Sequence, residues 1–152
     1  MFASHEVIAG VSYDEALRRL ADLIHAAGLD TASQAAYRDG LTHAIRVGPA
    51  ASVTRSVQVR FREVVIHDGS AVLTLRWEAT GPGARMLPVL DADITICPAN
   101  GNATTLRMVG VYRPPLGSLG ARLDRVILSR VATATIRSFV TRVASDLTSL
   151  PV

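Results

Sequence analysis

The feature that most constrains the fold is a change of periodicity near the end of the chain. From about His43 to Arg113, apolar and polar residues alternate in short runs separated by turn sequences. A period of two predicts strands with one apolar and one polar face, as in an antiparallel sheet with one side in water. Pro114 and Pro115 end the alternation, and a segment with an apolar stripe at helical spacing follows to about Thr148.

The apolar face of these strands supplies the candidates for lining an interior. Trp77 and Tyr112 matter most, because each joins a large apolar body to one polar group. The alternative is that both are core residues whose N–H and O–H groups bind the backbone. The candidate ligand-binding residues are Phe61, Leu73, Leu75, Trp77, Ile94, Met108 and Tyr112.

The polar face carries charges of both signs, which favour cross-strand pairing and a structural role. Glu63 is different, because strict alternation places it on the apolar face of its strand. A carboxylate there would be desolvated and could act as a general acid or base. The alternative is that the strand frays or bulges and leaves Glu63 in solvent. Glu63 and Tyr112 are the two candidates for a catalytic role. The charges of the polar face are Arg60, Arg62, Arg76, Glu78, Asp91, Asp93 and Arg107.

The first forty residues predict one strand and two short helices. Residues 3–10 alternate as a strand, and Ser12 with Glu15 forms a capping box in which each side chain binds the other's amide. Gly28 suits the left-handed position after the first helix. A second cap at Thr31 opens a helix through about Arg38, with Gly40 at its end.

The last helix is expected to run from about residue 116 to residue 148. Gly110, in the middle of the strand before it, indicates a bulge or a close approach of this helix. Small residues among the larger ones of the helix would leave room for a ligand or allow closer packing. These small residues are Ala132, Ala134 and Ala144.

Composition excludes several classes of protein. The 152 residues, 49% of them hydrophobic, predict one globular domain over residues 1–152. The net charge of +3 comes from scattered arginines without an aromatic-interleaved basic run, so we expect no nucleic-acid partner. No signal-peptide pattern and no apolar run of membrane-spanning length is visible, so we expect a cytoplasmic protein without membrane insertion.

Recognised motifs of catalysis and cofactor binding are not found in the sequence. The four histidines lie far apart, and Cys97 is the single cysteine, so we expect no metal site. The glycine-containing sequences "GPG" and "GSLG" match neither a P-loop nor a dinucleotide-binding fingerprint, and there is no GxSxG nucleophile motif. We therefore expect no cofactor.

The order of strand, two short helices, antiparallel strands and one long helix resembles the START-like superfamily, also called SRPBCC or helix-grip proteins. The resemblance is carried by "DADITICPANGNATTLRMVGVYRPPLGSLGARLDRVILSRVATATIRSFVTRVA", and most strongly by the Tyr112–Gly117 junction and the helix after it. It implies an α+β helix-grip fold in which a curved antiparallel sheet wraps around the C-terminal helix, with a space between them that is often a hydrophobic cavity.

Three functions follow as hypotheses from this resemblance. The first is binding of a small hydrophobic ligand, such as a lipid, an isoprenoid or a polyketide, between the sheet and the helix. The second is an enzyme similar to polyketide aromatase/cyclases, in which polar groups of the cavity orient a poly-keto chain and assist proton transfer. The third is a packed interior, with the protein acting through protein partners.

Overall fold

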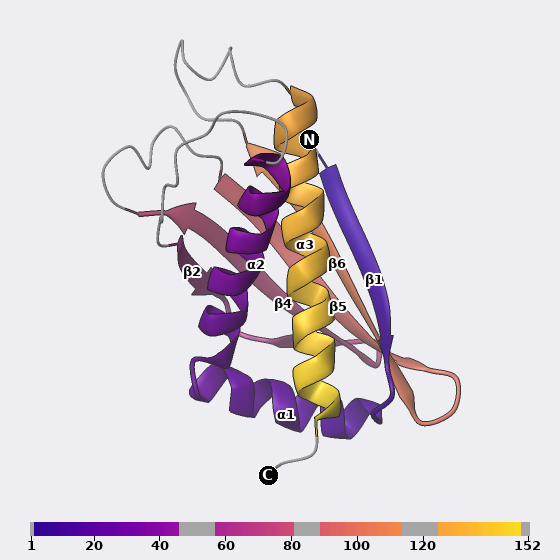
Figure 1. The fold of residues 1–152 in the computed structure, drawn as a ribbon. Coiled ribbons are helices and arrows are strands. Elements are labelled where there is room, and N and C mark those ends of the chain that lie inside the picture. Colours follow the sequence, from indigo (N-terminus) through magenta and orange to yellow (C-terminus); the bar gives the residue numbers. More distant parts are fainter. Residues whose placement is uncertain (1, 46–56, 81–88, 114–124, 150–152) are drawn as a thin grey trace.

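The chain forms one antiparallel sheet with three helices against one of its faces (Figure 1). The computed structural model describes residues 2–45, 57–80, 89–113 and 125–149, and the findings below concern this part of the chain. Figure 1 shows α2 and α3 side by side over the sheet, while α1 crosses below the C-terminal end of α3. The elements are β1 (Phe2–Ala9), α1 (Tyr13–His25), α2 (Gly28–Ile45), β2 (Val57–Phe61), β3 (Val65–His67), β4 (Ser70–Ala79), β5 (Val89–Ala99), β6 (Ala103–Arg113) and α3 (Arg125–Thr148).

The strands pair in the order β1-β6-β5-β4-β2, and β3 also pairs with β4. Asp68 and Gly69 both have positive φ, 47° and 73°, in the tight turn between β3 and β4 that the sequence predicts. The predicted alternation is confirmed in β4, β5 and β6, where every second residue is buried. The buried face is covered by the helices, so the core lies between the sheet and α3.

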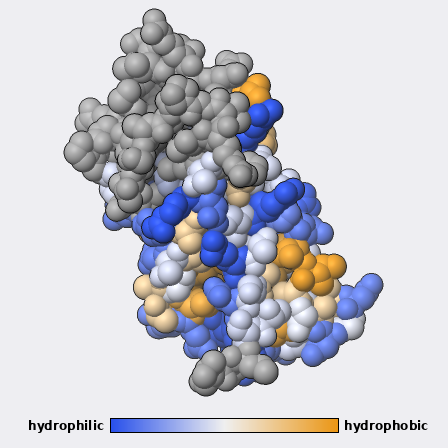
Figure 2. Space-filling model, viewed as in Figure 1, coloured by the Kyte–Doolittle hydropathy of each residue, from blue (hydrophilic) through white to orange (hydrophobic). Residues whose placement is uncertain are grey.

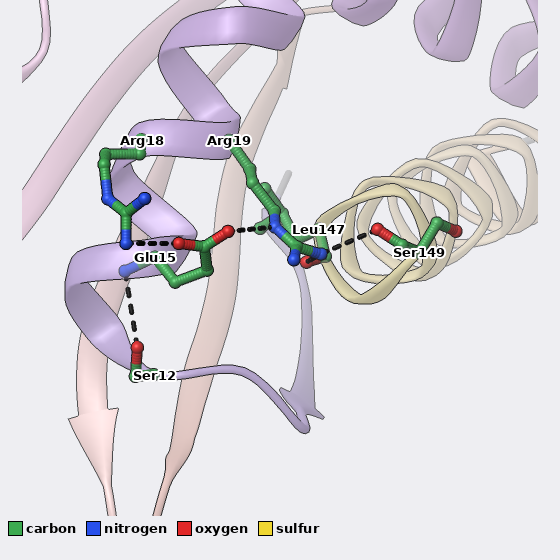
Figure 3. Close-up of polar contacts among 6 residues, drawn as sticks. All are labelled: Ser12, Glu15, Arg18, Arg19, Leu147 and Ser149. Atoms are coloured by element: carbon green, nitrogen blue, oxygen red, sulfur yellow. Dashed lines mark hydrogen bonds and ion pairs between the residues drawn. The ribbon is translucent and has the colours of Figure 1, made fainter. Parts of the chain in front are cut away.

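The start of α1 also fastens the end of α3 (Figure 3). The Ser12 hydroxyl accepts from the Glu15 amide at 3.4 Å, which confirms half of the predicted capping box. The Glu15 carboxylate binds the guanidinium groups of Arg18 and Arg19 and does not return to the Ser12 amide. Arg19 then donates from Nη1 to the carbonyls of Leu147 and Ser149, at 2.8 and 2.7 Å. One guanidinium therefore satisfies carbonyls that the end of α3 leaves unpaired.

The second helix is longer than the sequence predicts. The left-handed residue between the helices is Ala27, with φ of 54°, and Gly28 begins α2. Thr31 is not a cap, since its hydroxyl donates to the Ala27 carbonyl one turn earlier, at 3.3 Å. The helix passes through Gly40 to Ile45, so the strand pattern expected from about residue 43 was wrong as far as Ile45. The next strand of the described residues, β2, starts at Val57.

Gly40 is needed for space, because α2 and α3 touch at this residue. A Cβ atom added to Gly40 would lie 1.9 Å from Thr135 Oγ1 and 3.0 Å from the Val131 carbonyl oxygen. Gly110 serves the same purpose on β6, where a Cβ would lie 2.9 Å from Ile136 Cδ1 and 2.8 Å from Leu90 Cδ1. The β5–β6 register is continuous through Gly110, so the close approach is confirmed and the bulge is not.

The long C-terminal helix is confirmed from Arg125 to Thr148, while residues 116–124 lie outside the described part of the chain. Its stripe of Thr135, Phe139, Val143 and Leu147 is buried. Val126, next to the start of α3, is 53% exposed, so the apolar stripe expected over this helix is not buried there. On the outer side, Asp39 of α2 accepts from Ser138 Oγ at 2.6 Å and pairs with Arg142 at 2.8 Å, which fixes α2 against α3.

Gly40→Ala is expected to destabilise the protein, although alanine is the better helix former. Rotation of the Thr135 side chain would move Oγ1 out of the way but would leave the Val131 carbonyl in place, so the helices must separate. We expect a loss of about 1–3 kcal/mol in the free energy of unfolding, measured by urea denaturation. Gly10→Ala is the control, because a Cβ there meets nothing within 4 Å. Equal stability of Gly40→Ala and the wild type would contradict the close contact.

Stability is also expected to depend on the charge of Glu15. The hydrogen bond from Arg19, followed by the charges of Arg18 and Arg19, lowers the pKa of Glu15 below its ordinary value of 4.5. The contribution of the Glu15 carboxylate to the free energy of unfolding is therefore complete above pH 4.5. It is lost as the pH falls through the lower pKa that Glu15 has in the folded state. Glu15→Gln should lower the melting temperature at neutral pH, and the difference from wild type should vanish in acid. Asp14→Asn, which removes a charge from the same helical turn, is the control. A Glu15→Gln effect that persists in strong acid would show that the loss of stability does not come from the charge of Glu15.

Candidate functional site

The register of the sheet brings four side chains into one row across its inner face: Val59, Trp77, Leu90 and Tyr112. We call these four residues the end row, because β2 begins and β4 and β6 end close to it. Trp77 and Tyr112 are 2% and 4% exposed. Both belong to the set that the sequence proposed as ligand-binding, and the sheet places them two strands apart on the same face.

Trp77 is held by both helices that cover the sheet. Its indole N–H donates to Ser33 Oγ of α2 at 3.2 Å. Its ring meets the ring of Phe139 of α3 edge-on, with centroids 5.0 Å apart and an interplanar angle of 85°. The indole N–H therefore has a protein partner, as the core interpretation requires, but this partner is a side-chain hydroxyl and not the backbone.

Tyr112 stands near a second buried phenol, Tyr37 of α2. Both rings are almost fully buried, with Tyr37 at 7% exposure. Burial raises the pKa of the Tyr112 hydroxyl far above its ordinary value of 10.0, and the neighbouring Tyr37 raises this pKa further. Burial therefore favours the neutral phenol, whose O–H can donate a hydrogen bond.

The other residues proposed from the sequence lie deeper or nearer the edge. Leu73, Leu75, Ile94 and Met108 are at most 1% exposed and belong to the hydrophobic core cluster. Phe61, at the end of β2, is partly buried and packs against that cluster. In the middle of the interior, Ile136 of α3 and Leu90 of the end row both fill the space over Gly110. Of the proposed set, Trp77 and Tyr112 are the members that lie in the end row.

Glu63 does not join the site. Pairing with β4 is interrupted after Phe61: the Arg62 amide still donates to the Thr74 carbonyl at 2.8 Å, and pairing resumes at Val65 of β3. Residues 62–64 therefore bulge opposite Leu73 and Thr74. Glu63 lies in the segment 62–64 between β2 and β3 and is exposed. The expectation of a desolvated carboxylate was wrong, and the alternative, a strand that frays or bulges and leaves Glu63 in solvent, is correct. The alternation of inward and outward side chains was extended beyond Phe61, the last residue of β2 that pairs with β4.

Three buried polar residues of the helices were missed as site residues by the sequence reasoning. Ser33 and Tyr37 lie four positions apart on α2, so they share one face, which turns toward the end row. Thr135 of α3 is 2% exposed, and its hydroxyl has no hydrogen-bond partner among the described residues. The available signal was the spacing of four between Ser33 and Tyr37, both within the helix expected from Thr31 to about Arg38. Their proximity to Trp77 and Tyr112 joins segments that are distant in sequence, which the spacing does not show.

The outer face of the sheet carries the expected charge pairs. Arg76 binds Glu78 at 2.6 Å and Asp91 of the neighbouring strand at 3.6 Å, and Arg113 also binds Asp91. Asp93 accepts from the Thr74 hydroxyl at 2.6 Å. These contacts support a structural role for the charges of this face.

The described ranges contain no cluster of three or more His, Cys, Asp or Glu side chains that could hold a metal ion. Cys97, on β5, is partly buried. Within the same ranges, no helix combines the length and the apolar character that crossing a bilayer would require.

Solved structures with a similar fold were found. A conserved protein from Geobacillus kaustophilus is similar over 97% of this chain and 95% of its own, with 16% identity and a TM-score of 0.56. The chain has the helix-grip fold. The expected helix-grip architecture is confirmed: a six-stranded antiparallel sheet, two helices after the first strand, and a long C-terminal helix against the sheet.

Two further solved structures match with TM-scores below 0.5. A hypothetical protein from Helicobacter pylori matches with 12% identity and a TM-score of 0.46, over 93% of this chain and 87% of its own. The Zhui aromatase/cyclase from Streptomyces sp. R1128 matches with 11% identity and a TM-score of 0.34, over 94% of this chain and 93% of its own. No protein-family model matches the sequence, and no curated protein matches it.

The Trp77–Ser33 hydrogen bond is expected to couple β4 to α2. In a double-mutant cycle of Trp77→Phe and Ser33→Ala, we expect a coupling of about 0.5–1.5 kcal/mol in the free energy of unfolding. The four proteins are compared by urea denaturation. Ser4→Ala replaces Ser33→Ala in the control cycle, because Ser4 is exposed on β1, and this cycle should be additive. Additivity in both cycles would show that the bond contributes nothing to stability.

Proposed function

We propose that the protein binds a small hydrophobic ligand between the sheet and the C-terminal helix, at the end row. The observation that carries the proposal is the pair of buried amphipathic aromatics, Trp77 and Tyr112, on one row of the sheet. Helices α2 and α3 face this row with Ser33 and Phe139, while farther along the sheet the interior is occupied by contacts such as Ile136 on Gly110.

The chemistry of the end row favours a ligand with an apolar body and one oxygen. The body would lie against Trp77 and Leu90, and the Tyr112 hydroxyl would donate to a carbonyl or hydroxyl oxygen of the ligand. A lipid, an isoprenoid and a polyketide each meet this description. An apolar pocket with few polar groups that fix orientation is the usual form of such a site.

Binding is favoured over an aromatase/cyclase-like reaction. General acid–base catalysis of ring closure requires ionisable groups within reach of the substrate. Of the two candidates, Glu63 is exposed in the segment after β2, and Tyr112 is a phenol whose pKa burial raises. The second candidate function is action through protein partners with a filled interior. It is favoured by the contacts at Gly40 and Gly110, where small residues admit α3 and leave no room for a ligand.

The test begins with native mass spectrometry of gently purified protein, where we expect a co-purifying compound of lipid size. Binding of a fluorescent fatty acid is then followed through Trp77, which is the single tryptophan of the chain. Tyr112→Phe should weaken binding by roughly two- to tenfold, as expected for one lost hydrogen bond.

Tyr13→Phe is the matched control, because it removes the same hydroxyl from a tyrosine of α1 and should leave the affinity unchanged. If the wild-type protein co-purifies with no ligand and shows no saturable binding of the probe, the interior is filled and the partner-binding function replaces this proposal. Equal losses of affinity in Tyr112→Phe and Tyr13→Phe would place the ligand away from the end row.

A further inference from the structure

The two edges of the sheet are built differently. At one edge, β2 has only five residues, carries the exposed Arg60, and is followed directly by the exposed Arg62. Short length and outward cations are the usual protection of an edge strand against pairing with another chain. At the other edge, β1 has eight residues, contains neither lysine, arginine nor proline, and keeps a continuous register with β6 along its whole length. The β1 edge therefore has none of these protections.

The outer side of the β1 edge is also apolar. Phe2 is 78% exposed and Ile8 is 67% exposed, near the two ends of the strand. Val111 lies directly opposite Phe2 on β6, and Val109 is the next outward residue of β6; these valines are 36% and 37% exposed. Figure 2 shows the other, helix-covered face of the molecule, where blue and orange residues are mixed. Among the described residues, no helix lies beyond this strand in Figure 1.

We propose that the β1 edge pairs with β1 of a second copy of this chain, antiparallel and about a two-fold axis at His5. The pairing would join the two sheets into one, with both α3 helices on the same side. Phe2 then lies opposite Ile8 of the partner subunit, and Ser4 lies opposite Glu6 of the partner subunit. The strand is complementary to itself in this register, because its apolar residues stand at equal distances from His5.

Charge selects this register over its neighbours. A shift of two residues in one direction places Phe2 opposite Glu6 of the partner subunit, so that an apolar ring faces a carboxylate. A shift in the other direction places Glu6 opposite Glu6 of the partner subunit, and like charges directly opposite are destabilising. In the proposed register each Glu6 faces a serine across the new pairing, and on its other side it lies opposite Arg107 of its own β6. An odd shift would set inward residues against outward ones.

The first test is the oligomeric state of the chain, measured by sedimentation over a range of protein concentrations. We expect a dimer whose dissociation constant rises by about tenfold or more in Phe2→Lys and in Ile8→Lys, since each removes an apolar contact and adds a charge. Ile66→Lys is the matched control, because Ile66 is 65% exposed on β3, away from the β1 edge, and this variant should remain a dimer. A wild-type protein that stays monomeric at the highest concentration reached overturns the proposal, as does a dimer that all three variants leave intact.

The second test addresses the register. In a Cys97→Ser background, His5→Cys should form a disulfide-linked dimer on mild oxidation, because cross-strand Cα atoms at the two-fold axis lie within disulfide range. Ser4→Cys should cross-link far less, since in this register it faces Glu6 of the partner subunit. Cross-linking of the two variants to the same extent would contradict the register, and circular dichroism of both reduced proteins checks that they are folded.

Discussion

The contact of α3 with α2 and with the sheet is the constraint on which the rest of the structure depends. Two glycines permit it: Gly40, where Thr135 packs against the α2 backbone, and Gly110, where Ile136 packs against β6. Because both neighbours belong to one turn of α3, the helix is fixed at the same level against both layers. This position of α3 places Phe139 against Trp77, and the end row then faces Ser33 and Tyr37 of α2.

Much of the fold follows from periodicity, and the errors have identifiable physical causes. Alternation predicted the buried face of β4 to β6 correctly, since a paired strand must place successive side chains on opposite faces. The same rule failed at Glu63, because pairing with β4 is interrupted at residues 62–64 and a sequence pattern does not mark where the ladder is interrupted. Gly40 was expected to end a helix, because glycine is conformationally free. In the structure α2 continues through Gly40, and a glycine is needed there because α3 lies too close for any side chain.

The candidate site was only partly predictable for a related reason. Trp77 and Tyr112 could be singled out as amphipathic aromatics, but their partners Ser33 and Tyr37 come from a helix that is distant in sequence.

The two faces of the sheet carry different types of polar group. The outer face carries ionised pairs such as Arg76 with Asp91, while the polar groups identified beneath the helices are hydroxyls and an indole N–H. Neutral groups of this kind can be buried at lower cost than charges, and they orient a bound molecule without ionising it.

The pairing of β1 with β6 has a consequence for the order of folding. The two strands are neighbours in the sheet, but two helices and four strands separate them along the chain. The hairpins of β3 with β4 and of β5 with β6 are local and can form early, whereas closing the sheet with β1 requires a long loop to be ordered first. During synthesis, β1 therefore leaves the ribosome long before its partner strand, and it must stay unpaired with its apolar residues exposed until β6 has emerged. A chaperone that shields extended apolar segments would have its longest opportunity to act at this strand.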